Sequence, residues 1–286
     1  TFAMFGASVL VPIIFGIDPS IVLLMNGVAT LLFIWITKGK SPAYLGSSFA
    51  FIGPTSIIIA NQGFEYAQGG FVVLGIIGCI MAFVIHRVGT KWINVVLPPA
   101  AMGAVVALIG LELAHLTIQG GSIGANLMTD TATAQNFAVF FITLGTAVLG
   151  SVLFKGFLST IPILIAIVVG YISAIAFGMV DFTPVMEASL FTMPHFQLAK
   201  FDMNAILTML PVLLVLTSEH IGHQVVTSNV VGRDLIKDPG LHRSLFADYF
   251  ASALSGLIGG VPTTTYGENI GVMAITRVYS VRVIAG

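Results

Sequence analysis

The chain has 286 residues, of which 57% are hydrophobic and 8% are charged, and its formal net charge is −1. A soluble domain carries roughly 25% charged residues. This sequence could therefore not cover its own surface in water, and lipid must cover it instead. The balanced charge and the lack of a basic tract give no reason to expect a nucleic-acid partner. The single cysteine, Cys79, excludes a disulfide framework.

The predicted elements are apolar runs near the length of about 20 residues that a membrane-spanning helix needs. In chain order these runs lie near 2–15, 19–37, 66–86, 92–117, 136–154, 157–179, 203–227 and 243–260. Two more segments, 44–60 and 263–276, are too irregular for ordinary spans and are predicted as broken crossings. The sequence thus predicts an all-α multi-pass membrane protein with ten crossings.

Both ends of the sequence lie in apolar runs. Thr1 has no charged n-region or cleavage site before it, so we expect no signal peptide. An eleventh crossing is predicted to begin after Tyr279. We therefore expect a piece of a longer chain.

The basic residues test this count of crossings. If the crossings alternate in direction, only Lys200 falls on one side of the membrane. The positive-inside rule makes the opposite, basic side cytoplasmic and places the loops 118–135 and 180–202 outside. The basic side holds Lys38, Lys40, Arg87, Lys91, Lys155, Arg233, Lys237, Arg243, Arg277 and Arg282.

The two broken crossings carry a binding-site signal. Residues 46–53 and 263–269 have the glycine, aromatic and β-branched content of short extended stretches. Irregular backbone at membrane depth must be buried in protein or line a wet cavity. Interrupted segments in corresponding positions of two halves point to a transporter's site. With seven crossings per half, each would be third in its repeat, and the second half would be inverted. Re-entrant loops without a ligand are the alternative.

Ionisable residues within the predicted spans are functional hypotheses by default. Glu219 and His223 are four residues apart and share one helix face. Glu268 lies at the break of the tenth crossing. These three groups suit a polar solute and a proton.

Three other ionisable residues are expected to be structural. Glu112 lies near the outer end of its span, and Asp248 is expected to cap its helix or to extend toward water. His220 points about 100° away from Glu219 around the helix, so packing is its expected role. No nucleophile–base pair, metal-ligand set or cofactor motif emerges, so we expect no enzyme, no metal and no cofactor.

Four motifs now make the sequence specific. Residues 268–277 read Glu-Asn-Ile-Gly-Val-Met-Ala-Ile-Thr-Arg, and their acid-Asn-x-Gly-x4-Thr-Arg pattern resembles the signature of the nucleobase–ascorbate transporter family. Residues 44–51, 98–103 and 219–223 read Tyr-Leu-Gly-Ser-Ser-Phe-Ala-Phe, Pro-Pro-Ala-Ala-Met-Gly and Glu-His-Ile-Gly-His. These three resemble the bacterial uracil permease branch of that family, and the resemblance runs along essentially the whole chain.

The resemblance implies a fourteen-helix inverted-repeat transporter with a core and a gate. The core would comprise 1–90 and 203–286, and the gate 91–180. The family's functional His before Thr1, most of helix 11 and gate helices 12–14 would be missing from this sequence. The family also implies a bacterial inner membrane and a homodimer formed through the gate.

The resemblance further implies proton-coupled uracil uptake and assigns the site. Glu219 and Glu268 would accept the ring N–H groups. The backbone amides of Phe49 and Gly267 would donate to the ring carbonyls. His223 would bind through water and, with Glu268, take part in the proton step. Two other residues would line the pocket, Tyr266 and Ala7.

Three alternatives stay open at this point. A xanthine, urate or other nucleobase permease of the same family is the first. An anion transporter on a related fold is the second, and two buried glutamates oppose it. An intramembrane enzyme is the third. The hydroxyls of 263–265 also leave sodium coupling possible.

Overall fold

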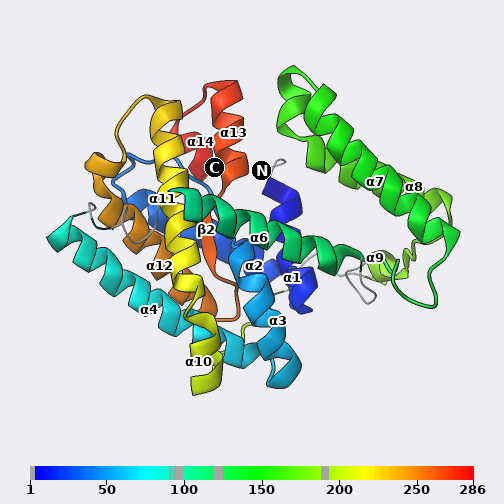
Figure 1. Ribbon diagram of the computed structural model, residues 1–286, viewed down its shortest axis with the longest axis horizontal. Helices are drawn as coiled ribbons and strands as arrows, with labels where there is room; N and C mark the ends of the chain where they lie inside the picture. Colours follow the sequence, from blue (N-terminus) through cyan, green and yellow to red (C-terminus); the bar gives the residue numbers. More distant parts are fainter. Residues whose placement is uncertain (1–3, 90–91, 93–98, 119–124, 188–192) are drawn as a thin grey trace.

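The computed structural model describes residues 4–89, 92, 99–118, 125–187 and 193–286 (Figure 1). Helices make up most of it, with two short strands between them. The first part of the chain forms α1 (Phe5–Phe15), α2 (Pro19–Ile36), β1 (Leu45–Ser47), the 3-10 turn η2 (Phe49–Phe51), α3 (Ile52–Asn61) and α4 (Phe64–Val88).

The middle part is also helical. It forms α6 (Pro99–Ile118), α7 (Ala134–Leu153), the 3-10 turn η3 (Gly156–Thr160), α8 (Pro162–Ala176) and α9 (Thr183–Glu187). Figure 1 shows α7 and α8 as an antiparallel hairpin set to one side of the other helices. The last part forms α10 (Met203–Met209), α11 (Val212–Val231), the π-turn η4 (Ile236–Gly240), α12 (Leu241–Leu257), β2 (Thr263–Thr265), α13 (Gly267–Thr276) and α14 (Val281–Ala285).

The predicted crossings compare well with these helices. Among the described residues, four helical segments are long and apolar enough to span a membrane: α2 (Pro19–Ile36), α4 (Phe64–Val88), α7 (Ala134–Leu153) and the consecutive helices α10 and α11 taken together (Met203–Val231). Each coincides with a predicted crossing. The remaining predicted crossings correspond to shorter helices or include residues that are not described.

Both broken crossings are confirmed, with shorter strands than predicted. The strands β1 and β2 pair antiparallel, with Leu45 opposite Thr265 and Ser47 opposite Thr263. The prediction extended the first strand to residue 53, whereas the chain turns helical at Phe49. A helix satisfies its own backbone groups at membrane depth, so the chain stays extended only where a partner strand is available.

The outer edges of this two-stranded sheet are satisfied by side chains. On the β1 side, the Leu45 N–H donates to Thr30 Oγ1 of α2 at 3.0 Å. On the β2 side, the Thr263 N–H donates to Ser252 Oγ of α12 at 3.1 Å, and that hydroxyl donates to the Thr263 carbonyl at 2.7 Å. An unpaired buried strand edge is costly. The helices α2 and α12 therefore close the two edges of the sheet.

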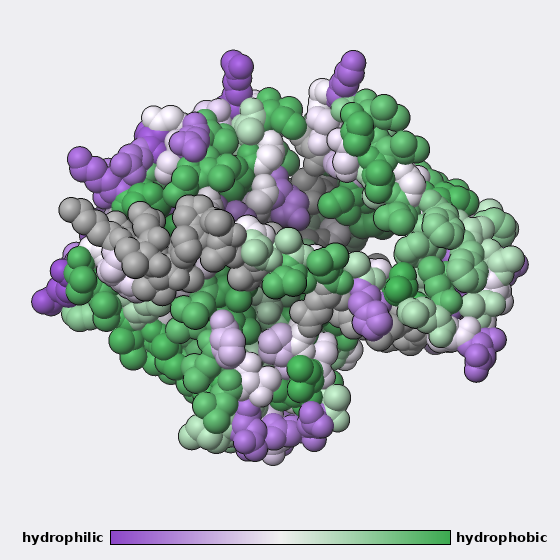
Figure 2. All heavy atoms as spheres, viewed as in Figure 1, coloured by the Kyte–Doolittle hydropathy of each residue, from purple (hydrophilic) through white to green (hydrophobic). Residues whose placement is uncertain are grey.

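The outer surface is apolar. Large side chains such as Trp35 and Val152 are more than three-quarters exposed. Figure 2 shows green, hydrophobic residues across much of the visible face, with purple, hydrophilic ones gathered at its ends. Monomeric soluble proteins rarely expose contiguous apolar area on this scale. The chain is a multi-pass membrane protein.

Polar groups outside the spans fix the ends of the helices. Asp18 caps α2 by accepting from the Ser20 N–H at 2.9 Å. The Ser20 hydroxyl and N–H together hold the pKa of Asp18 below its ordinary value. Lys200 pairs with Glu65 at the start of α4 at 2.7 Å, which raises the pKa of Lys200.

Candidate functional site

A cavity of about 270 Å³ lies where α11 passes the two broken crossings. Three segments distant in sequence supply its walls: α11, β1 with η2, and β2 with the first turn of α13. Its lining comprises Ser47, Phe49, Glu219, His223, Thr264, Thr265, Tyr266, Gly267 and Glu268.

The cavity brings together six of the seven predicted site residues. The seventh, Ala7, lies on α1, and its side chain is outside the described part of the structure, as is that of Glu112. Three lining residues, Ser47, Thr264 and Thr265, were not predicted to bind substrate. All three lie within the extended stretches that the sequence did single out, so the strand pairing was the missing information.

The two carboxyl groups of the cavity are free acceptors. Glu219 and Glu268 are both partly buried. Neither has a hydrogen-bond partner among the described residues, although both line the cavity. A buried polar group without a partner costs free energy. These two acids are therefore placed for a ligand that donates hydrogen bonds to them.

The same cavity also offers backbone donors. The helix α13 begins at Gly267, and its first turn leaves N–H groups without intrahelical partners. The turn η2 begins at Phe49 in the equivalent position after β1. Two helix beginnings and two acids thus border the same cavity, so donors and acceptors are available in one small space.

Tyr266 fits into this site because Gly46 has no side chain. Its hydroxyl donates to the Ser47 carbonyl at 3.0 Å, across the two strands. Its ring lies against the Tyr44 ring, with centroids 5.8 Å apart. A Cβ at Gly46 would lie 2.7 Å from the ring atom Cε2. The close strand approach therefore fixes the ring as one wall.

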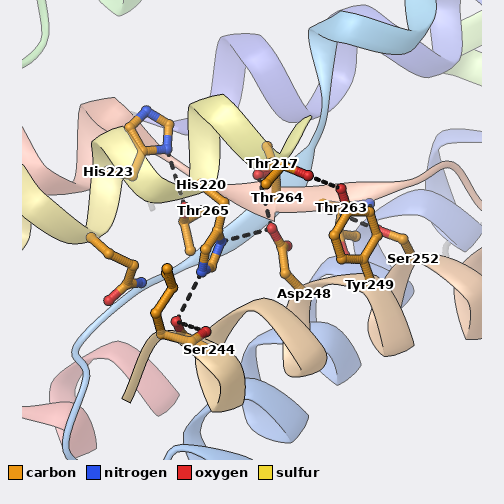
Figure 3. Close-up of polar contacts among 12 residues, drawn as sticks. Thr217, His220, His223, Ser244, Asp248, Tyr249, Ser252, Thr263, Thr264 and Thr265 are labelled. Atoms are coloured by element: carbon orange, nitrogen blue, oxygen red, sulfur yellow. Dashed lines mark hydrogen bonds and ion pairs between the residues drawn. The ribbon is translucent and has the colours of Figure 1, made fainter. Parts of the chain in front are cut away.

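His223 is oriented by Thr265. Its Nδ1 lies 3.1 Å from Thr265 Oγ1, from α11 to β2 (Figure 3). Its Nε2 faces the start of α13, since a Cβ on Gly267 would lie 3.4 Å from that nitrogen. One ring nitrogen is therefore anchored to the strand and the other faces the cavity.

A fully buried polar network supports the cavity from behind (Figure 3). His220 Nδ1 lies 2.8 Å from Asp248 Oδ2, and both side chains are inaccessible to solvent. Thr264 Oγ1 donates to the same Asp248 oxygen at 3.2 Å. The expectation that Asp248 caps its helix or extends toward water is wrong. Its partner is 28 residues away in sequence, a contact that only the packing of α11 on α12 creates.

The protons of this network can be placed. The Ser244 hydroxyl donates to the Leu241 carbonyl at 3.1 Å, so it accepts from His220 Nε2 at 3.0 Å. One further proton then lies between His220 Nδ1 and Asp248 Oδ2, and the pair is neutral as a unit. Neutrality avoids the large cost of an uncompensated buried charge. The expectation that His220 only packs is therefore incomplete.

Comparison with known proteins decides the family. The Permease family matches residues 1–286, the whole of this sequence. The chain belongs to the Permease family. Its likeness to the bacterial uracil permease branch, predicted from three motifs, is confirmed by curated relatives of that name. It is accordingly a transporter-family protein and not an enzyme.

Several relatives resemble this permease along its full length. It is 52% identical to the uracil permease of Escherichia coli K12 over 286 residues, which are 100% of this chain and 66% of that protein. It is 45% identical to the uracil permease of Bacillus subtilis over 292 aligned residues, covering 100% of this chain and 67% of that protein. The chain thus spans about two thirds of the length of these relatives.

A solved structure shows the fold. The transmembrane domain of the cyanobacterial bicarbonate transporter BicA aligns with a TM-score of 0.60 at 17% identity, covering 99% of this chain and 80% of that one. At this identity the likeness concerns the fold alone. It confirms the predicted fold class, an all-α multi-pass membrane transporter fold.

Proposed function

We propose that this chain is the larger part of a proton-coupled uracil permease of a bacterial inner membrane. Its relatives at 45% and 52% identity carry the name uracil permease. The observation that carries the proposal is a pair of carboxyl groups, Glu219 and Glu268, that line one cavity and have no partner within the described ranges of the chain. The same cavity adjoins two helix beginnings.

Uracil complements this cavity in polarity. Its ring has two N–H donors and two carbonyl acceptors. In the proposed pose, Glu219 and Glu268 accept from the N–H groups, and the amides of Phe49 and Gly267 donate to the carbonyls. The Tyr266 ring forms a wall, and Ala7 is proposed to complete the pocket from α1.

The size of the cavity favours a single ring. Its volume of about 270 Å³ is below the roughly 300–1,000 Å³ of pockets for drug-sized ligands. A pyrimidine therefore suits the site better than a two-ring purine. We expect uracil to displace labelled uracil more effectively than xanthine or urate does. A purine that competes better would transfer the proposal to another nucleobase.

The proton step is assigned to Glu268 and His223. Both line the cavity, and the Nε2 of His223 faces the first turn of α13, where Glu268 lies. Uptake by proteoliposomes of the full-length protein should follow an inward proton gradient and stop with an uncoupler. Uptake that follows a sodium gradient and ignores the uncoupler would assign the coupling to sodium.

The domain assignment is also a proposal. We assign residues 1–90 and 203–286 to a core that carries the cavity, and 91–180 to a gate. The separate position of the α7–α8 hairpin supports this division (Figure 1). Transport would move the core against the gate, and a homodimer would form through the gate.

The decisive experiment is equilibrium binding of labelled uracil to the purified full-length protein. Glu219→Gln and Glu268→Gln keep the side-chain volume but exchange a carboxyl group for an amide, which presents a donor where the ring N–H needs an acceptor. A buried donor left without a partner costs about 1–3 kcal/mol, so we expect each variant to bind roughly 5- to 150-fold more weakly. The matched control is Glu187→Gln, which lies exposed on α9 and should bind normally. Unchanged binding in both cavity variants would refute the site.

A further inference from the structure

A second hollow lies on the outer face of α4 and α12, away from the cavity. It is a groove of about 560 Å³, lined by apolar side chains and the Cys79 thiol. On α4, Ile80 and Phe83 line it and are more than half exposed. On α12, Phe246 and Phe250 line it with parallel, stacked rings whose centroids are 5.8 Å apart.

Close packing of the two helices explains the groove. At the contact between them, a Cβ on Gly75 would lie 2.6 Å from the Ala253 Cβ, so only glycine fits there. Small residues of this kind let membrane helices approach closely. The larger side chains on either side of the contact then form two ridges with a hollow between them. The groove is therefore a fixed consequence of backbone approach.

Two arginines lie at one end of this groove. The Arg87 guanidinium carbon lies 4.9 Å from the centroid of the Phe83 ring, which lines the groove. Arg243 precedes Phe246 by three residues and so shares its helix face. The rings of His86 and His242, one residue before each arginine, are 4.3 Å apart, which joins the two helix ends.

This end of the groove carries uncompensated positive charge. The ion pairs of the described residues involve other groups, and no carboxylate among them lies within 4.0 Å of either arginine. Burial lowers the pKa of His242, and the neighbouring His86 and Arg243 lower it further. The positive-inside rule places this end at the cytoplasmic surface, where the lipid leaflet is anionic.

We propose that the α4–α12 groove binds an anionic phospholipid, with its phosphate at Arg87 and Arg243 and one acyl chain along the groove. Every apolar face of a membrane protein contacts lipid, so contact alone is no argument. This face differs because an apolar groove ends at two arginines for which the described part of the chain supplies no carboxylate within 4.0 Å. Basic pockets between membrane helices at the cytoplasmic side recognise anionic headgroups.

Photolabelling of the full-length protein in lipid nanodiscs tests the proposal. The probes are phosphatidylglycerol and phosphatidylcholine that carry the same diazirine-labelled acyl chain. The measured quantity is a ratio. It is the labelling of the groove peptides, residues 72–83 and 246–257, divided by the labelling of a reference peptide, residues 137–149 in α7. We expect this ratio to be at least fivefold higher for phosphatidylglycerol than for phosphatidylcholine.

Variants separate the headgroup contact from the apolar surface. Arg87→Gln and Arg243→Gln should each lower the phosphatidylglycerol preference about fivefold, which equals ~1 kcal/mol per basic residue. Lys155→Gln removes the same charge at the same membrane side and should leave the preference unchanged. Normal uracil binding by the arginine variants would show that they are folded, because neither residue lines the cavity.

Three outcomes would overturn the proposal. The groove peptides could show no preference for phosphatidylglycerol, or a preference that survives both arginine changes together. They could also remain unlabelled by either probe, which would mean that another protein segment or a second copy covers the groove. Excess glycerol phosphate should not reduce labelling. If it does, the arginines form a site for free phosphate and the lipid assignment is wrong.

Discussion

The pair formed by His220 and Asp248 gives the sharpest test of the structure. Removing the imidazole by His220→Ala leaves Asp248 with the Thr264 hydroxyl as its remaining partner at 3.2 Å. The other carboxyl oxygen, Oδ1, has no hydrogen-bond partner among the residues that the structure describes. Breaking a buried pair in this way costs about 3–5 kcal/mol. The variant should therefore lower the free energy of unfolding by that amount.

Removing the acid has a smaller expected effect. After Asp248→Ala, His220 can lose its shared proton and stay neutral, since its Nε2 still donates to Ser244 at 3.0 Å. Its Nδ1 and the Thr264 hydroxyl then lack a partner. An unsatisfied buried group costs roughly 1–3 kcal/mol. In the double variant neither group is left buried without the other. The double variant should therefore lower the free energy of unfolding by at least 2 kcal/mol less than the two single variants do in sum.

The assay is reversible unfolding of the full-length protein in mixed micelles, followed by circular dichroism. The control His195→Ala removes an exposed imidazole and should change the free energy of unfolding by less than about 0.5 kcal/mol. If the losses of unfolding free energy in the two single variants add up to that of the double variant within about 0.5 kcal/mol, the two residues are independent. That result would refute a buried, proton-sharing pair.

Two further variants test the strand pairing. Gly46→Ala should displace the Tyr266 ring, because the new Cβ would lie 2.7 Å from Cε2. Overpacking of this kind costs typically 1–3 kcal/mol, so both uracil binding and thermal stability should fall. The control Gly27→Ala has open space around its new Cβ and should leave uracil binding and thermal stability unchanged. Ser252→Ala removes both hydrogen bonds to the Thr263 backbone and should cost about 2–4 kcal/mol. Hydrogen exchange of the Thr263 amide should then become faster, and an unchanged rate would show that the hydroxyl does not close the sheet.

Local sequence features predicted the course of the chain through the membrane. Apolar length is a property of each segment, so the four long spans of the structure were readable one at a time. The acid–histidine face of α11 was equally local, because Glu219 and His223 are four residues apart on a helix. The break before Glu268 was visible in composition. For these features no distant partner had to be known.

Pairings between segments that are distant in the chain could not be predicted from the sequence. The strand register, with Gly46 opposite Thr264, depends on how α2 and α12 hold the two edges. The partnership of His220 with Asp248 depends on the rotation of two helices about their axes. Helical periodicity correctly predicted that the His220 side chain points away from Glu219. It could not predict that Asp248 lies on that side of the helix.

The sequence by itself determined that lipid covers this protein, which long segments are able to cross the membrane, and that Glu219 and His223 share one helix face. Those properties follow from the transfer free energy of single segments into a bilayer. Only the tertiary structure decided that two broken crossings pair, that a neutral His–Asp pair supports them, and that six predicted residues line one cavity. Those properties depend on contacts between segments far apart in the chain, where hydrogen-bond satisfaction and close glycine packing select one arrangement.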